Sequence, residues 1–153
     1  MNTKEIIKEI IKQFHVSPEV KITQRTLQLP LEIGKVISLI GVRRSGKTYL
    51  LLDTINRLIA NGIPKDNMLF ILQAWREIHK GITPEKQYFF FDEIQNVNGW
   101  EKFVRRIYDT VTPYIYITGS NSAFLAKEIA TSLRGRTLQY EVFPFSFSEF
   151  LKH

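Results

Sequence analysis

The chain has 153 residues, a length that suits one domain with its own hydrophobic core. Hydrophobic residues make up 44% and charged residues 24%, which argues against disorder, and the absence of cysteine excludes disulfide scaffolds, thiolate metal sites and cysteine nucleophiles. The 21 Lys and Arg exceed the 15 Asp and Glu, and the net charge of +6 fits either binding of a polyanion, such as a nucleotide or DNA, or a merely solubilising surface.

The first 24 residues predict a helical extension. Ile6, Ile10 and Phe14 recur at helical spacing among charged residues, and Ser17-Pro18 ends the pattern. Acidic residues interrupt this apolar pattern, so it does not resemble a signal peptide, and no apolar run approaches the roughly 20 residues of a membrane span. We therefore expect a soluble, cytoplasmic protein without membrane contact.

Residues 25–153 alternate between predicted strands and helices. A short strand is expected at 26–31. Further strands are predicted at 36–40, 68–71, 88–91, 114–118 and 137–142, and helices at 48–60, 73–80, 100–110 and 123–133, with another element beginning at 147–151. This alternation is typical of an α/β fold, in which helices cover both faces of a mostly parallel sheet.

A complete phosphate-binding pattern, G-x-x-x-x-G-K-[ST], follows the strand at 36–40. Its residues are Gly41, Val42, Arg43, Arg44, Ser45, Gly46, Lys47 and Thr48. Between a buried strand and an amphipathic helix, the backbone N–H groups of such a loop and the positive helix end bind phosphate. We expect Lys47 to reach the β- and γ-phosphates and the Thr48 hydroxyl to bind Mg²⁺. Arg43 and Arg44 are further candidates for contact with phosphate or a partner, and a chance match is the weaker alternative.

Two acids, Asp92 and Glu93, follow the aromatic strand at 88–91. Ligands of open parallel sheets bind at the carboxyl ends of strands, so Asp92 should face the loop and hold Mg²⁺. Glu93 is expected to act as the general base that polarises the attacking water. Taken alone, the pair would be read more simply as solvated acids at a strand end. Beside the loop, the second acid favours a hydrolase over a small-molecule kinase, and the absence of Asn-Lys-x-Asp favours ATP over GTP.

Polar and basic residues follow the strand at 114–118. Ser120 and Asn121 are candidates to orient the attacking water or to sense the γ-phosphate, with Asn121 preferred, and capping of the next helix explains them equally well. Arg134 and Arg136 could stabilise negative charge in the transition state. On the residues alone, two exposed cations that complement the helix dipole are the simpler explanation.

Five segments in chain order carry a family resemblance. They are GVRRSGKT, FFFDEIQNVNGWEKFVRRIYD, ITGSNSAFL, SLRGR and FPFSFSEFL, and together they resemble the predicted AAA-type ATPases of bacteria and archaea. The resemblance implies the sheet order 5-1-4-3-2, binding of ATP with Mg²⁺, and ATPase activity. It implies phosphate-loop roles for Lys47 and Thr48, metal and water roles for Asp92 and Glu93, and a sensor at Ser120 or Asn121. It also makes Arg134 and Arg136 candidates for an arginine finger or a sensor.

The same family has a C-terminal domain of unknown function after its P-loop core. We therefore expect residues 25–153 to be an ATPase core from which that domain is missing. The polar loop after the second strand is shorter here, at 70–75, which makes the edge strand less certain than in the family. Candidate partners are ATP and ADP, further copies of the chain, and a DNA or protein bound through the absent domain. The alternative function is a nucleotide-gated binding module with negligible hydrolysis.

Overall fold

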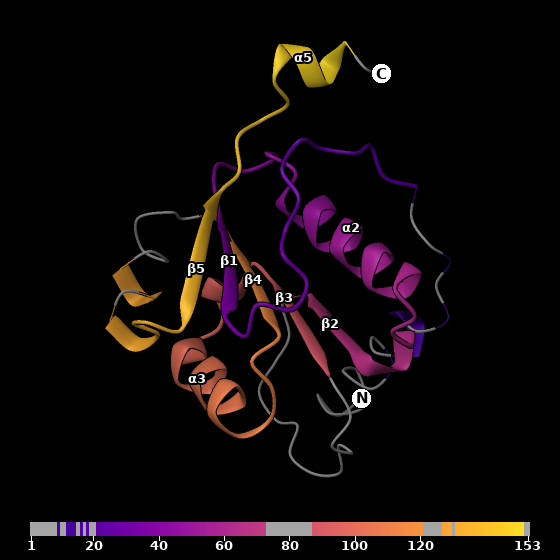
Figure 1. Cartoon of the computed structure of the whole chain (residues 1–153). Helices are drawn as coiled ribbons and strands as arrows, with labels where there is room; N and C mark the ends of the chain where they lie inside the picture. Colours follow the sequence, from indigo (N-terminus) through magenta and orange to yellow (C-terminus); the bar gives the residue numbers. More distant parts are fainter. Residues whose placement is uncertain are drawn as a thin grey trace.

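Five parallel strands form a single sheet at the centre of the molecule (Figure 1). The computed structural model describes residues 9, 12–14, 16, 18, 21–72, 87–120, 127–129 and 131–151, apart from the side chains of 69–72. The strands are β1 (Val36–Ile40), β2 (Met68–Leu72), β3 (Tyr88–Asp92), β4 (Ile115–Gly119) and β5 (Thr137–Glu141). Their spatial order is β2-β3-β4-β1-β5, and every neighbouring pair is parallel. Counted from β5, this is the expected order 5-1-4-3-2.

Helices connect and flank these strands. They are α2 (Lys47–Ala60), α3 (Trp100–Thr110) and the short α5 (Phe147–Phe150), together with the 3-10 turns η1 (Lys65–Asn67) and η2 (Ile94–Asn96). Each predicted strand or helix between 36 and 72, and between 88 and 118, agrees with the structure to within one residue at either end. The described residues of the predicted N-terminal helix, Glu9, Lys12–Phe14 and Val16, are helical. The predicted helix at 73–80 lies outside the described residues.

The strand predicted at 26–31 is wrong, because this segment is irregular. Its carbonyl oxygens bond to side chains instead of to a neighbouring strand. Arg57 Nη1 donates to the Leu29 carbonyl oxygen at 2.8 Å, and the Tyr116 hydroxyl donates to the carbonyl oxygens of Pro30 at 2.9 Å and Leu31 at 2.8 Å. Pro30 also lacks the N–H that a strand ladder requires. The apolar pattern here reflects Leu29, which is buried in the core.

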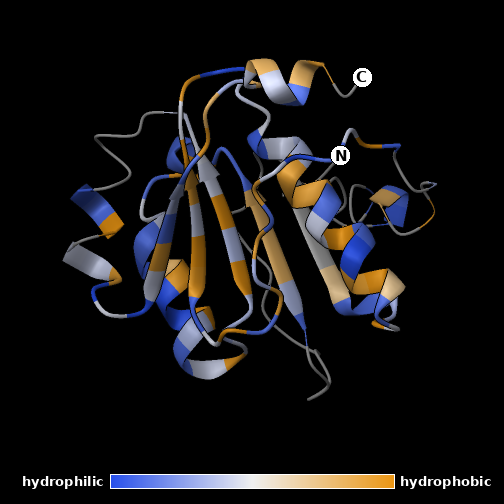
Figure 2. Ribbon diagram, turned by 45° about the horizontal axis from the view of Figure 1, so that its top comes forward, coloured by the Kyte–Doolittle hydropathy of each residue, from blue (hydrophilic) through white to orange (hydrophobic). Residues whose placement is uncertain are grey.

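The core has two halves, one on each face of the sheet. Successive side chains of a strand point to opposite faces, so Ile37 and Leu39 pack with α2 residues, whereas Val36 and Ile40 pack with α3 residues. The result is three layers, with α2 and α3 on opposite sides of the sheet (Figure 1). Figure 2 shows the apolar residues that run along the strands between these helices. None of the described helices combines the length and apolar character needed to cross a bilayer.

Every residue of the three inner strands β1, β3 and β4 is buried. Parallel strands buried on both faces are held by packing on each side as well as by their hydrogen-bonded neighbours. Their carboxyl ends therefore provide a rigid edge. The loop after β1, the acids after β3 and the polar residues after β4 all stand at this edge.

Candidate phosphate-binding site

The loop between β1 and α2 curls around the Lys47 ammonium group. Lys47 Nζ donates to the carbonyl oxygens of Gly41 at 3.0 Å and Val42 at 2.8 Å. Gly41 has φ +147°, and a Cβ atom there would lie only 2.3 Å from the Val142 carbonyl oxygen, so no other residue fits. The tight passage of the chain beside β5 thus depends on glycine, and it places the buried Lys47 inside the loop.

Ser45 supplies a buried polar atom without a partner. Its hydroxyl oxygen is shielded from solvent and makes no hydrogen bond to any described residue. Leaving such a group unsatisfied costs about 1–3 kcal/mol, which a ligand with oxygen atoms in the loop would relieve. Val42, Arg43 and Arg44, in contrast, are exposed on the outside of the loop, and Arg44 takes a left-handed conformation with φ 63°.

A chain of hydrogen bonds joins α2, β3 and β4 beside the loop. Thr48 Oγ1 donates to Asp92 Oδ2 at 2.8 Å, and Thr118 Oγ1 donates to Asp92 Oδ1 at 2.5 Å. Thr118 Oγ1 also accepts from the Glu93 backbone N–H at 2.9 Å. Because β4 is the neighbour of β3, its Thr118 hydroxyl can hold both the Asp92 carboxylate and the Glu93 backbone in place. The predicted metal ligands, Thr48 and Asp92, are thus brought into contact.

Glu93 is held by three hydrogen bonds that all end on one carboxylate oxygen. Oε2 accepts from Gln95 Nε2 at 2.6 Å, from the Ser120 N–H at 3.1 Å and from the Ser120 hydroxyl at 2.8 Å. No described residue donates to Oε1. The backbone of Glu93 is left-handed, with φ 52°, a conformation that costs a residue other than glycine about 1 kcal/mol. Ser120, one of the predicted site residues, therefore contacts the Glu93 carboxylate. Asn121, the other candidate, lies outside the described residues.

Charge and burial act in opposite directions on the two ionisable groups of the site. Burial alone would raise the pKa of Glu93, but the hydrogen bonds from Gln95 and Ser120 and the charge of Lys47 outweigh it, so the net pKa is lowered. Burial lowers the pKa of Lys47, while the charges of Glu93 and Asp92 oppose this effect. Glu93 is therefore ionised at neutral pH.

The oxygens of Thr48 and Asp92 fit a magnesium ion. Mg²⁺ prefers oxygen ligands, and beside a nucleotide it commonly takes one or two protein groups together with phosphates and water. The hydroxyl and carboxylate oxygens 2.8 Å apart are a donor set of this kind. In the part of the chain that the structure describes, no three His, Asp or Glu side chains gather into a cage made by the protein alone.

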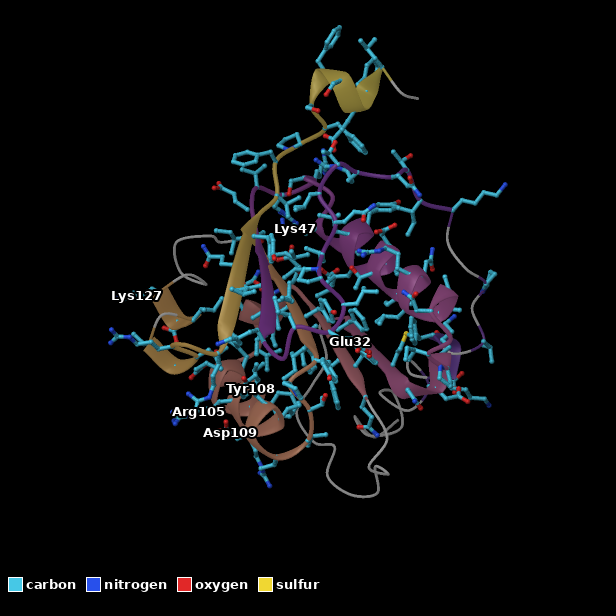
Figure 3. The ribbon with its side chains drawn as sticks, in the orientation of Figure 1. Glu32, Lys47, Arg105, Tyr108, Asp109 and Lys127 are labelled. Atoms are coloured by element: carbon cyan, nitrogen blue, oxygen red, sulfur yellow. The ribbon has the colours of Figure 1, made fainter. Side chains whose placement is uncertain are left out.

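Arg134 and Arg136 lie at the other end of the sheet. Arg136 precedes β5, and its carbonyl oxygen accepts from the Val36 N–H at 2.8 Å, at the start of β1. Its side chain pairs with Asp109 of α3 at 3.3 Å. Figure 3 places Lys47 near one end of the strands and Tyr108 and Asp109 near the other. Five residues of strand span about 16 Å, so neither arginine joins Lys47 within one chain.

The structure adds functional residues that the sequence analysis did not identify. Thr118 was predicted only as part of a strand, although a hydroxyl in an otherwise apolar buried strand was a signal for it. Gln95 follows the acids by two residues, and nothing in the motif indicated that it contacts Glu93. Arg25 and Glu149 form a buried ion pair beside the loop, and although Glu149 lies in the FPFSFSEFL segment, nothing in the sequence indicated that it pairs with Arg25.

Three features of this structure define the class of P-loop NTPase-like proteins. They are a parallel sheet between helices, a glycine-bounded loop after β1 and an acid at the end of β3. The AAA domain family matches residues 34–151. The chain therefore belongs to this family of AAA-type P-loop ATPases.

Two curated relatives of the chain are uncharacterised proteins. An uncharacterised protein of Methanocaldococcus jannaschii is 40% identical over 99% of this chain and 36% of its own length. An uncharacterised protein of Haemophilus influenzae is 39% identical over 76% of this chain and 32% of its own length. The chain thus spans about a third of the length of these curated relatives. No solved structure matches it at a significant level.

Proposed function

We propose that the chain binds ATP with Mg²⁺ and hydrolyses it. The observation that carries this proposal is the contact between Thr48 Oγ1 and Asp92 Oδ2 at 2.8 Å. It joins the phosphate-loop motif to the acidic strand end, although the two residues stand 44 positions apart in the sequence. A phosphate loop that lies against an acid in this way has the parts needed for a nucleotide with a divalent cation.

The phosphate loop would bind the triphosphate through its backbone. In this proposal the N–H groups of the loop surround the phosphates, Lys47 supplies a positive charge, and the Ser45 hydroxyl gains the partner that it lacks. Thr48 and Asp92 would hold Mg²⁺, which when bound neutralises negative charge on the phosphates. The residues proposed to bind nucleotide are Gly41, Val42, Arg43, Arg44, Ser45, Gly46, Lys47, Thr48 and Ser120.

Glu93 would serve as the general base. Gln95 and Ser120 occupy Oε2, so among the residues that the structure describes none competes with a water for Oε1, the oxygen that would accept the proton. The lowered pKa keeps the carboxylate ionised, which a proton acceptor requires. Thr118 and Gln95 are positioning residues in this scheme, because each holds Glu93 without reaching the reacting atoms itself.

Association of several copies of the chain would complete the site. Because Arg134 and Arg136 stand far from Lys47 in their own chain, we propose that they act on the nucleotide of a neighbouring copy. Turnover per chain should then rise with protein concentration, and this rise should be lost in Arg134→Ala or Arg136→Ala. We also propose Asn121 as a further contact to the γ-phosphate or its water.

The chain would act as a nucleotide-driven switch within a longer protein. Its relatives are about three times as long, since the chain spans 36% and 32% of them. We propose that hydrolysis in this domain changes how the remainder of such a protein holds a DNA or protein partner. Limited proteolysis of the full-length protein with ADP, and with a non-hydrolysable ATP analogue, should give different fragments.

Calorimetric titration with ATP, with and without Mg²⁺, tests the proposed function. Wild type should bind ATP and release phosphate, and Lys47→Ala should lose most of its affinity because the only buried cation of the described loop is removed. Lys35→Ala is a matched control, because Lys35 donates to the Gly135 carbonyl oxygen at the other end of β1. Wild type that ignores adenine nucleotides, or equal losses in the two variants, would contradict the proposal.

A further inference from the structure

The Arg25 guanidinium group lies against the outer side of the phosphate loop. Its side chain is only 9% exposed and contacts three segments of the chain. Nη1 donates to the Ser45 carbonyl oxygen at 2.8 Å, Nη2 donates to the Phe143 carbonyl oxygen at 2.8 Å, and Nε donates to Glu149 Oε1 at 3.1 Å. One planar group thus links the loop to the segment after β5. A lysine could not make these contacts together, because it lacks the fork of donors.

Glu149 is in turn fixed from several sides. It accepts from the Ser146 N–H at 2.9 Å, which forms a capping box at the start of α5, and from the Thr26 N–H at 2.9 Å. The ring of Phe145 covers the guanidinium group, with its centroid 4.5 Å from Arg25 Cζ. Both members of the ion pair are therefore held by several hydrogen bonds and largely shielded from water, which favours a fixed geometry.

The contact with Ser45 sets the direction of the next N–H group. In a trans peptide the C=O and N–H bonds point in opposite directions. With the Ser45 carbonyl held outward by Arg25, the Gly46 N–H must point away from Arg25, toward the other side of the loop. No described residue accepts a hydrogen bond from this N–H. Gly46 itself has φ +92°, and an added Cβ would lie 3.2 Å from Arg25 Nη1, so the arrangement also depends on glycine.

We propose that Arg25 is a positioning residue that orients the Gly46 N–H for the phosphates, and that Glu149 ties this arrangement to α5. The inference rests on the proposed nucleotide binding and names a residue outside the 34–151 match to the AAA domain family. Through the pair, a shift of α5 displaces Arg25, and loss of Arg25 frees the Ser45–Gly46 peptide to rotate. Nucleotide affinity and the position of the C-terminal segment are therefore linked.

The test compares two arginines that each donate to a backbone carbonyl. Arg25→Lys should weaken ADP binding by roughly tenfold, the effect of losing one well-oriented charged hydrogen bond. Arg57→Lys is the matched control, because Arg57 donates to the Leu29 carbonyl oxygen, away from the loop. It should lose thermal stability without losing affinity for ADP. ADP without Mg²⁺ is the ligand used, so the result does not depend on the metal site or on turnover.

Glu149→Gln provides a second test in case Arg25→Lys folds poorly. Its ADP affinity should also fall, and the double variant should bind no more weakly than Arg25→Lys alone, because both changes act through the same contact. In the free protein, the Gly46 amide resonance should move in Arg25→Lys and stay in Arg57→Lys. Unchanged ADP affinity in Arg25→Lys and in Glu149→Gln would overturn the inference. Wild type that binds no nucleotide would instead overturn the proposed function.

Discussion

The phosphate loop is supported on two sides by groups of very different kinds. On its inner side, Thr48 at the start of α2 is joined by hydrogen bonds to Asp92 and Thr118 at the ends of buried strands. On its outer side, Arg25 and Glu149 form an ion pair between two segments that are not part of the sheet. The inner acid and Thr118 take their positions from the sheet, whereas the outer pair takes its position from long-range contacts of Arg25 and Thr26 with the segment after β5.

The two sides also differ in how much core packing surrounds them. The inner strands are buried over their whole length, so a change there costs core packing. The outer pair connects to α5, where Phe147 and Phe150 are 76% and 68% exposed. Figure 2 shows this apolar helix standing apart from the sheet. We therefore expect the inner side to determine hydrolysis and the effect of Mg²⁺ on ATP affinity, and the outer side to change the affinity for nucleotide bound without the metal.

Glu93→Gln should have the largest effect, on the inner side. The amide has the shape of the carboxylate but cannot accept a proton from water, so kcat should fall by about 10³-fold while ATP affinity stays within about twofold. Phosphate release and equilibrium binding measure the two quantities. Phosphate release at the wild-type rate would rule out Glu93 as the base.

Glu149→Gln should have the next largest effect, on the outer side. It leaves the buried Arg25 without its counter-charge and should lower the free energy of unfolding by about 3 kcal/mol. Urea denaturation followed by tryptophan fluorescence measures this loss. A change below about 0.5 kcal/mol would show that the pair behaves like an exposed ion pair.

The lowered pKa of Glu149 predicts that the stability of the protein depends on pH. The hydrogen bond from Arg25, followed by those from the Ser146 and Thr26 backbones, lowers the pKa of Glu149 below its ordinary value of 4.5. A lowered folded pKa means that the contribution to stability is complete above the ordinary value and is lost as the pH falls below it. Wild type should therefore lose stability below about pH 4.5 more steeply than Glu149→Gln. Parallel stability curves in acid would contradict the assignment.

Thr118→Val should have a smaller effect, again on the inner side. It removes the hydroxyl that holds Asp92 and the Glu93 N–H, and should cost about 2 kcal/mol because both lose a buried partner. It should also lower kcat, because the acids lose their alignment. Thr112→Val is the matched control, since Thr112 bonds to the Gln87 carbonyl oxygen before β3. If the control lowered kcat equally, Thr118 would have no special role.

Arg136→Ala should have the smallest effect on stability. Its ion pair with Asp109 is exposed, at 34% and 42% of the side-chain surface, and such pairs contribute about 0.5 kcal/mol. Thermal unfolding at low and high salt measures this contribution, and the small difference in stability from wild type should vanish at high salt. A loss of stability as large as that of Glu149→Gln would show that the exposed pair contributes as much as the buried pair.

Local patterns were enough to predict most of the fold and the inner side of the site. β-branched and aromatic runs indicated the inner strands, and the glycines and Lys47 indicated the loop. The segment at 26–31 was misread because its apolar residues pack on the core without a strand partner. The pairing of Arg25 with Glu149 could not be predicted, because they stand 124 positions apart and the FPFSFSEFL segment that contains Glu149 does not indicate a partner. Gln95 was missed because its role depends on the side-chain position of Glu93.

The dependence of ATP affinity on Mg²⁺ in wild type and in Asp92→Asn tests the central claim most directly. If Thr48 and Asp92 bring a cation to a triphosphate in the loop, Mg²⁺ should strengthen ATP binding to wild type, and Asp92→Asn should lose most of that gain while still binding ATP without the metal. The same gain from Mg²⁺ in both proteins, or no ATP binding to wild type, would contradict the account.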